Sequence, residues 1–314
     1  MEKLTSGGVL VIDKPAGMTS HDVVGRVRRL YGTKQVGHTG TLDPMATGVL
    51  VLLVGRAVKA SDFLLSEDKR YEALLRLGLR TDTEDMSGKV LSETAVLPHE
   101  EEVLEVCRSF VGGQLQVPPM YSALKVGGQK LVDLARKGLE VERAPRPITV
   151  YELNAGTVDA ASGLYRLDVR CSKGTYIRSL CRDIGEKIGC GGVMAALRRT
   201  QSGPFSLHGA HTLEELEEQP PEERLSALLP LEDLFSALPA VVMPDFYRRL
   251  SSSGCTVSCK KLRVDVPSGQ LLRLYGEDGC FYALGRVEEH EEGRGVKAVK
   301  QFILYDKDGK PCLC

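Results

Sequence analysis

Long apolar runs are missing from this sequence of 314 residues. The longest, residues 48–55 (GVLVLLVG), has the length of one buried strand, whereas a membrane-spanning helix needs about 20 apolar residues. The first residues also lack the charged segment followed by an apolar one that marks a secretion signal. We therefore expect a cytoplasmic protein with no membrane partner.

Metal-binding patterns are scarce as well. The nine cysteines are an odd number, and only Cys255 with Cys259 and Cys312 with Cys314 form close pairs. Neither pair has a second ligand pair at the spacing of a zinc site. His208 and His211 have the spacing of a weak metal pair, which we interpret as incidental. The sequence predicts free thiols in a reducing compartment and no metal.

An excess of charge of either sign is absent, since the formal net charge is -1. Composition alone therefore does not indicate a nucleic-acid-binding protein. Cations do gather locally, with six Lys or Arg against three acids in residues 124–148 and eight against three in residues 165–200. A basic face of this kind suits a phosphate backbone. Ordinary solvated faces explain the same pattern equally well, so charge leaves both interpretations open.

The length favours two domains, one large and one small. Predicted strands and helices interleave without a regular repeat, which indicates an α+β fold with a mixed, largely antiparallel sheet. An early helix is expected from Ser20, as its N-cap, to about Tyr31. After Pro239 the sequence changes to short β-like runs with turns, typical of a small β domain. We expect the domains to span residues 1–236 and 239–314.

The most informative segment is the loop of residues 37–48, GHTGTLDPMATG. Its three glycines permit backbone shapes that other residues avoid, and Pro44 restricts Asp43 to an extended backbone. The loop leads directly into the apolar strand of residues 48–55, which would give it a rigid base. A lone acid held in this way suits a nucleophile or a base. From the residues alone, an Asp-Pro turn with a capping carboxylate is the better explanation.

This loop resembles the catalytic signature of the TruB family of tRNA pseudouridine synthases. Four further segments resemble the family's other motifs in the same order: residues 13–20 (DKPAGMTS), 69–71 (KRY), 118–125 (PPMYSALK) and 171–178 (CSKGTYIR). The C-terminal stretch resembles, more loosely, the PUA-like RNA-binding domain that ends bacterial members. The resemblance implies a pseudouridine synthase catalytic domain followed by that domain.

The resemblance implies that a uridine in the T loop of tRNA, at position 55, is flipped out and isomerised to pseudouridine. The family needs no metal, nucleotide or other cofactor and no guide RNA. Asp43 is the expected catalytic carboxylate. It must stay ionised, so we expect a low pKa maintained by a salt bridge to Arg178. On its own, Arg178 could equally be a phosphate-binding or surface residue.

The resemblance also assigns the residues around the base. Tyr71 is expected to stack on the uracil and to assist its proton transfers. Tyr176 and Leu197 are expected to line the same pocket, and His38 to contact the RNA near the flipped nucleotide. Without the family motifs, Tyr71 and Leu197 would be interpreted as ordinary core residues.

Residues 124–148 correspond to a mobile insertion that closes on the T arm in this family. Predicted RNA contacts are Lys14, Lys125, Lys130, Arg136 and Lys173. Many members have an aromatic residue where this chain has Val132, so the clamp is expected to differ here without loss of catalysis. We expect a monomer. The competing hypotheses are a non-catalytic tRNA-binding or tRNA-folding factor, and an enzyme that also acts on RNA hairpins resembling the T loop.

Overall fold

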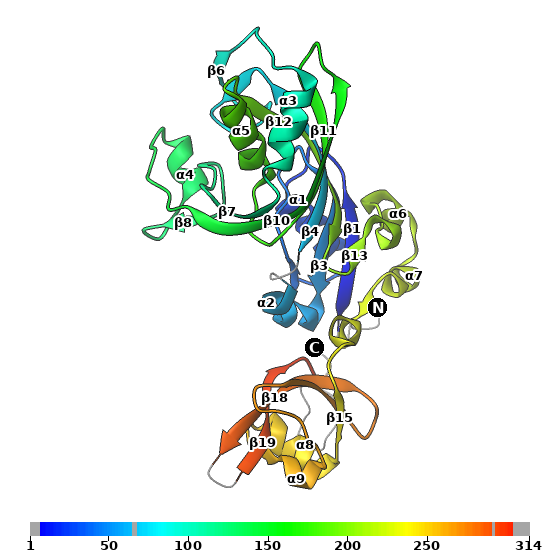
Figure 1. Ribbon diagram of the computed structural model, residues 1–314. Helices are drawn as coiled ribbons and strands as arrows, with labels where there is room; N and C mark the ends of the chain where they lie inside the picture. The colour runs from blue at the N-terminus through cyan, green and yellow to red at the C-terminus, as the bar shows by residue number, and fades with distance from the viewer. Residues whose placement is uncertain (1–6, 65–67, 291–292, 304–314) are drawn as a thin grey trace.

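The computed structural model describes residues 7–64, 68–290 and 293–303, and it contains two main sheets (Figure 1). The larger has the strand order β14-β1-β3-β12-β4-β11-β10-β7, with β2 and β13 on short branches. These strands are β1 (Gly8–Lys14), β2 (Val36–His38), β3 (Thr47–Val54), β4 (Lys69–Leu77), β7 (Gly112–Gln116), β10 (Arg146–Asp159), β11 (Leu164–Cys171), β12 (Gly192–Ser202), β13 (Phe205–Ser206) and β14 (Leu229–Pro230). All pairs are antiparallel except β12 with β3, which confirms the predicted mixed, largely antiparallel sheet.

Strand β3 is buried on both faces, as its uninterrupted apolar sequence predicts. Leu50 and Leu52 face the main core, while Val51 and Leu53 face a second apolar cluster on the opposite side. Strand β11 instead alternates between buried and accessible residues, because only one of its faces packs against the core.

Helices cover one face of the large sheet. They include α1 (Ser20–Leu30), α3 (Glu100–Arg108), α5 (Ile177–Ile188) and α6 (Leu213–Glu218). The N-cap of α1 is Thr19, which accepts a hydrogen bond from the amide of Asp22, so the prediction of Ser20 as the cap is wrong by one residue. Ser20 is the first helical residue, and its hydroxyl contacts the loop before β3 instead.

Strand β12 was not predicted, although it lies near the middle of the sheet between β3 and β4. Its pairing with β4 shifts register between Met194 and Ala196 and again between Arg199 and Gln201. A β-bulge breaks the two-residue alternation by which a strand is recognised in a sequence. This strand carries both Leu197 and Arg199 into the core.

The segment between β7 and β10 projects from the sheet, where Figure 1 labels β8 and α4. It contains a hairpin, β8 (Lys125–Val126) and β9 (Gln129–Lys130), followed by α4 (Leu131–Arg136). Met120, Leu131 and Leu134 form a small apolar cluster of their own. The predicted insertion is therefore a separately packed unit. A two-stranded sheet, β5 (Leu79–Thr81) and β6 (Val90–Glu93), follows directly after the C-terminal end of β4.

The rest of the chain forms a β-rich C-terminal domain. The remaining short helices of the large domain are η1 (Gly55–Ala60), α2 (Ser61–Leu64), η2 (Leu207–Gly209), α7 (Pro221–Ser226) and η3 (Leu231–Phe235). The sheet of the C-terminal domain has the order β15-β17-β18-β19-β16. The elements are β15 (Ala240–Met243), α8 (Asp245–Ser252), β16 (Val257–Ser258), α9 (Cys259–Leu262), β17 (Leu271–Gly276), β18 (Phe281–His290) and β19 (Gly293–Gln301). The predicted small β domain is confirmed, while its boundaries stay a prediction. Cys312 and Cys314 lie outside the described residues.

The C-terminal domain lies beyond the end of the large sheet near α2 (Figure 1), and the two domains share an apolar interface. Phe281 and Phe302 of the C-terminal domain pack with Phe235 against the face of β3 that carries Val51 and Leu53. Arg56 also donates a hydrogen bond to the carbonyl of Phe302, at 3.3 Å. The aromatic side chains of the C-terminal domain therefore belong to the same apolar cluster as the back of β3, the strand that follows the Gly-rich loop.

Candidate active site

Asp43 lies in the loop between β2 and β3, and a buried lysine anchors this loop on one side. The Nζ of Lys14 donates hydrogen bonds to the carbonyls of Pro15 at 2.8 Å, Met18 at 2.6 Å and Pro44 at 3.2 Å. Lys14 is 0% exposed, and burial lowers its pKa to about 8. These contacts correct the predicted RNA contact at Lys14, because its ammonium group faces the protein interior and not the solvent.

Arg199 anchors the other side of the loop. Its guanidinium donates to the carbonyls of Gly40 at 3.1 Å, Thr41 at 3.4 Å and Val49 at 2.7 Å, and the residue is 2% exposed. From the sequence, Arg199 is expected only to be one of the cations of residues 165–200. A signal was present, since residues two apart on a strand share a face, and Leu197 had been assigned to the pocket.

Ser20 completes the support of the loop. Its hydroxyl donates to the carbonyl of Leu42 at 3.0 Å and accepts from the amide of Leu42 at 2.9 Å. The residues before and after Asp43 are thus both fixed, Leu42 by Ser20 and Pro44 by Lys14. Such support restricts where the carboxylate of Asp43 can point.

Arg178 forms the expected salt bridge with Asp43. Its Nε lies 2.9 Å from Oδ2 of Asp43, and its Nη2 lies 3.2 Å from Oδ1. The arginine side chain is 5% exposed and the aspartate side chain 31% exposed. Arg178 also donates to the carbonyls of Thr83 at 3.1 Å and Tyr121 at 2.8 Å. A second carboxylate, that of Asp85, lies 3.8 Å from its Nη1.

The pKa of Asp43 differs from the expectation of a low value. Burial raises the pKa of Asp43 above its ordinary value, even though the neighbouring Arg178 and Lys14 lower it. The charge of Asp85 adds to the increase. The prediction weighed the opposite charge and not the loss of solvent around the carboxylate. The salt bridge therefore limits the increase without reversing it.

Tyr71 lies on β4 directly opposite Arg199 on β12, and Leu197 lies opposite Ala73. Burial raises the pKa of the Tyr71 phenol, so it is neutral near pH 7, and the charge of Asp43 acts in the same direction. Burial also raises the pKa of Tyr176, which precedes α5 and whose amide is held by the side chain of Gln116 at 2.8 Å. The charge of Asp43 makes a small contribution in the same direction at both tyrosines.

His38 lies on β2, just before the loop, and is half-buried. Burial lowers its pKa, and the positive charge of Arg199 adds to the decrease, so the imidazole is neutral near pH 7. Its Nδ1 is buried and makes no hydrogen bond within the described residues. An RNA contact by His38 therefore cannot use Nδ1 unless the side chain turns.

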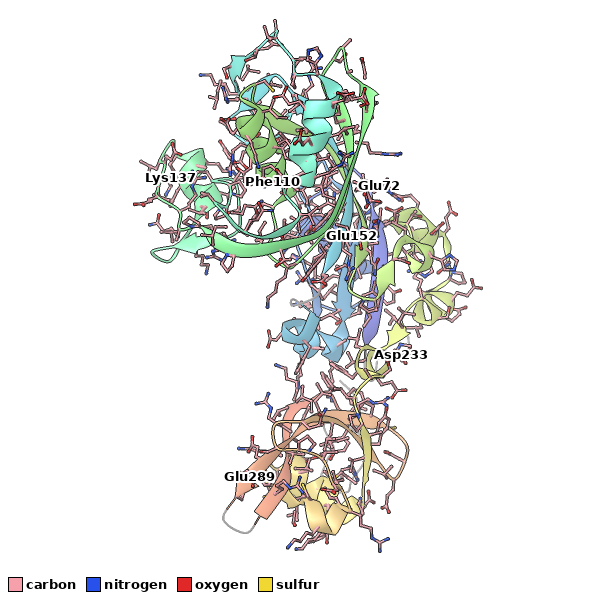
Figure 2. All side chains as sticks on the ribbon, in the orientation of Figure 1. Glu72, Phe110, Lys137, Glu152, Asp233 and Glu289 are labelled. Atoms are coloured by element: carbon pink, nitrogen blue, oxygen red, sulfur yellow. The ribbon has the colours of Figure 1, made fainter. Side chains whose placement is uncertain are left out.

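The remaining predicted RNA contacts lie away from Asp43. Lys125 and Lys130 face one another on the exposed hairpin of the insertion, and Arg136 is exposed at the end of α4. Figure 2 shows the next residue, Lys137, on the same projecting unit. Lys173 is exposed in the turn before α5. Val132 is half-buried, and its amide donates to the carbonyl of Ser122 at 3.1 Å.

Within the described ranges, no group of three or more His, Cys, Asp or Glu side chains is arranged to hold a metal ion. Over the same residues, no helix has both the length and the apolar character that crossing a membrane requires.

Known proteins resemble this chain over most of its length. Residues 28–177 match the model of the TruB family pseudouridylate synthase N-terminal domain, and residues 178–236 match that of the tRNA pseudouridylate synthase B C-terminal domain. The tRNA pseudouridine synthase B of Alkaliphilus oremlandii is 42% identical over 96% of this chain and 99% of its own length. That of Syntrophotalea carbinolica is 48% identical over 77% of this chain and 79% of its own length.

Among solved structures, a chain in the crystal structure of a Cbf5–Nop10–Gar1 complex matches with a TM-score of 0.70 at 26% identity. The match covers 98% of this chain and 88% of the other. The fold is therefore shared across the large sheet and the C-terminal domain.

Proposed function

Because the chain belongs to the TruB family of pseudouridine synthases, we propose that it converts the uridine at position 55, in the T loop of tRNA, to pseudouridine. Its curated relatives are named as synthases of pseudouridine in tRNA. The observation that carries the proposal is the two-point ion pair between Asp43 and Arg178, on a loop that buried side chains hold in place.

The reaction is a redox-neutral isomerisation. The bond from the ribose carbon to the uracil nitrogen breaks, the detached base turns, and a carbon of the ring forms the new bond. That ring carbon loses a proton and the nitrogen gains one, so no atom enters or leaves overall. An ionised Asp43 can attack the sugar or the ring, or remove a sugar proton, and each role needs a carboxylate held at a fixed position.

The residues near Asp43 suit a base that has left the RNA stack. Tyr71 offers an aromatic face and a neutral phenol that can donate or accept a proton. Leu197 and Tyr176 supply further walls, and His38 supplies a neutral imidazole just before the loop of Asp43. No group in this set needs a cofactor for these tasks.

We propose that the insertion holds the T arm through phosphate contacts by Lys125, Lys130 and Arg136, with Lys173 contributing from the turn before α5. Their exposure supports this assignment. The C-terminal domain would lie toward the acceptor side of tRNA. We further propose that the protein acts in the cytoplasm as a monomer, without a guide RNA.

The test is pseudouridine mapping on an unmodified tRNA transcript with the purified protein alone. Asp43→Asn is the matched variant, because it keeps the shape of the side chain and removes its charge. We expect product at position 55 with the wild type, no product with the variant, and equal tRNA binding by both. The assay omits guide RNA and added metal, so product formation would also show that the reaction requires neither.

Two outcomes would contradict the proposal. Binding of tRNA without product by the wild type would favour the tRNA-binding or tRNA-folding factor. Product in equal yield from Asp43→Asn would remove the assigned role of this carboxylate. Mapping the other uridines of the same transcript, and a hairpin that copies the T arm, defines how far the target extends.

A further inference from the structure

One residue beside the active site has a strained backbone and a buried charge. Glu84, in the loop between β5 and β6, has a φ of 63°. This left-handed conformation is uncommon for residues other than glycine, and it persists only where surrounding contacts impose it. Its side chain is 10% exposed, so its carboxylate also requires partners.

Helix α5 supplies those partners. The hydroxyl of Ser179 donates to Oε2 of Glu84 at 2.7 Å, and Nη1 of Arg182 contacts Oε1. Strand β12 holds the backbone of the same residue, because the amide of Met194 donates to the carbonyl of Glu84 at 3.0 Å. Glu84 is therefore fixed from two elements.

The residues on either side of Glu84 both contact Arg178. The carbonyl of Thr83 accepts from Nη1 of Arg178 at 3.1 Å, and Oδ2 of Asp85 lies 3.8 Å from the same nitrogen. Asp85 is itself oriented by the hydroxyl of Thr83, at 2.7 Å. Three consecutive residues thus contact the first turns of α5 at Arg178, Ser179 and Arg182.

A cavity of about 500 Å³ lies beside this contact, between the insertion and the loop. Glu84, Arg182 and Tyr121 line it. Since open space and not packed side chains borders the pair on this side, the side-chain hydrogen bonds and the charge of Glu84 contribute to holding the loop on α5, together with the contacts that Thr83 and Asp85 make with Arg178.

We infer that Glu84 is a positioning residue for catalysis, which aligns Arg178 with Asp43 by fixing Thr83 and Asp85 against α5. The inference rests on the proposed function. Glu84 acts through Arg178 and does not touch the substrate, so its loss affects the chemical step and leaves the affinity for tRNA unchanged. A displacement of the guanidinium by about 1 Å is enough to lower the rate by up to ~100-fold.

The experiment measures kcat and KM for tRNA in Glu84→Gln and Glu84→Gly. Glutamine keeps the size and removes the charge, whereas glycine removes the side chain and adopts a positive φ without strain. We expect kcat to fall by about tenfold or more in both variants, with KM unchanged. Glu84→Gly keeps the test decisive if Glu84→Gln does not fold, because it tolerates the same backbone.

Glu186→Gln is the matched control. Glu186 also lies on α5 and pairs with Arg80, at 2.5 Å, next to the same loop, but this pair is exposed and contacts neither Arg178 nor its partners. We expect wild-type kcat and KM from this variant. A second readout is Arg182→Gln combined with Glu84→Gln, whose loss of kcat should be less than the product of the two single losses.

The outcomes separate the inference from the proposed function. If the wild type makes no pseudouridine, the proposed function fails. If the wild type is active and the folded Glu84 variants match Glu186→Gln, the positioning role is overturned while the function stands. An increase in KM at constant kcat would also overturn it, since Glu84 would then act in RNA binding.

Discussion

The loop that carries Asp43 and the projecting insertion are held in opposite ways. Lys14, Ser20 and Arg199 fix the loop from three elements, and two of these residues are charged and fully enclosed. The insertion instead packs around its own small apolar cluster and presents its cations to solvent. The difference indicates that the carboxylate of Asp43 is positioned before RNA binds, whereas the insertion depends less on the large sheet for its packing.

Among these predictions, replacing Arg178, the ion-pair partner of Asp43, should have the largest effect on activity. In Arg178→Gln the ion pair with Asp43 is lost and two carboxylates remain close together, so we expect kcat to fall by about 100- to 1,000-fold. Single-turnover pseudouridine formation measures this effect. Arg170→Gln, which removes an exposed arginine paired with Glu152 on the outer face of the sheet, should retain wild-type activity. Equal losses in both variants would show a general effect on folding.

Lys14→Met tests whether a buried cation supports the loop. Three carbonyls would lose their donor, so we expect the free energy of unfolding to fall by about 1–3 kcal/mol and kcat to fall with it. Urea denaturation and steady-state kinetics measure the two effects. The matched control is Lys130→Met on the insertion, which should weaken tRNA binding without changing stability. If tRNA binding by Lys14→Met depended less on salt than binding by the wild type, Lys14 would contact RNA as first predicted.

The pH dependence follows from the raised pKa of Asp43. The ionised carboxylate is the active form, so kcat/KM should rise with pH through a midpoint above the ordinary value of 3.8. Between that value and the raised pKa, the folded state binds more protons than the unfolded state. The stability contribution of Asp43 therefore falls as pH rises through this window, and Asp43→Asn abolishes that slope. An activity midpoint at or below 3.8 would contradict the assignment.

The smallest effect is expected for the cations of the insertion. Combined replacement of Lys125, Lys130 and Arg136 by Ala should reduce the slope of log affinity against log salt by about 2 to 3, because each phosphate contact contributes about 0.7 to 0.9. Titration of tRNA at several salt concentrations measures the slope. At saturating tRNA, kcat should match the wild type. A loss of kcat would mean that closure of the insertion also assembles the active site.

Much of the large sheet and of the loop that carries Asp43 could be predicted from the sequence. The apolar run of β3, the alternation of β11 and the motifs around Asp43 and Arg178 are local patterns. Strand β12 was missed because its bulges break the alternation. The burial of Lys14 and Arg199 was missed because a cation is buried only when distant carbonyls surround it. The spacing from Leu197 indicates which face Arg199 shares, but not that carbonyls enclose it. The pKa of Asp43 was missed for the same reason, since burial is a property of the whole fold.

The two apolar faces of strand β3 restrict how its length can change. Leu50 and Leu52 face the main core, while Val51 and Leu53 face the aromatic side chains shared with the C-terminal domain. Inserting or deleting one residue would exchange these faces and turn the loop of Asp43 to the other side of the sheet. Exchanges between apolar residues along β3 should therefore be tolerated better than any change in the length of the strand.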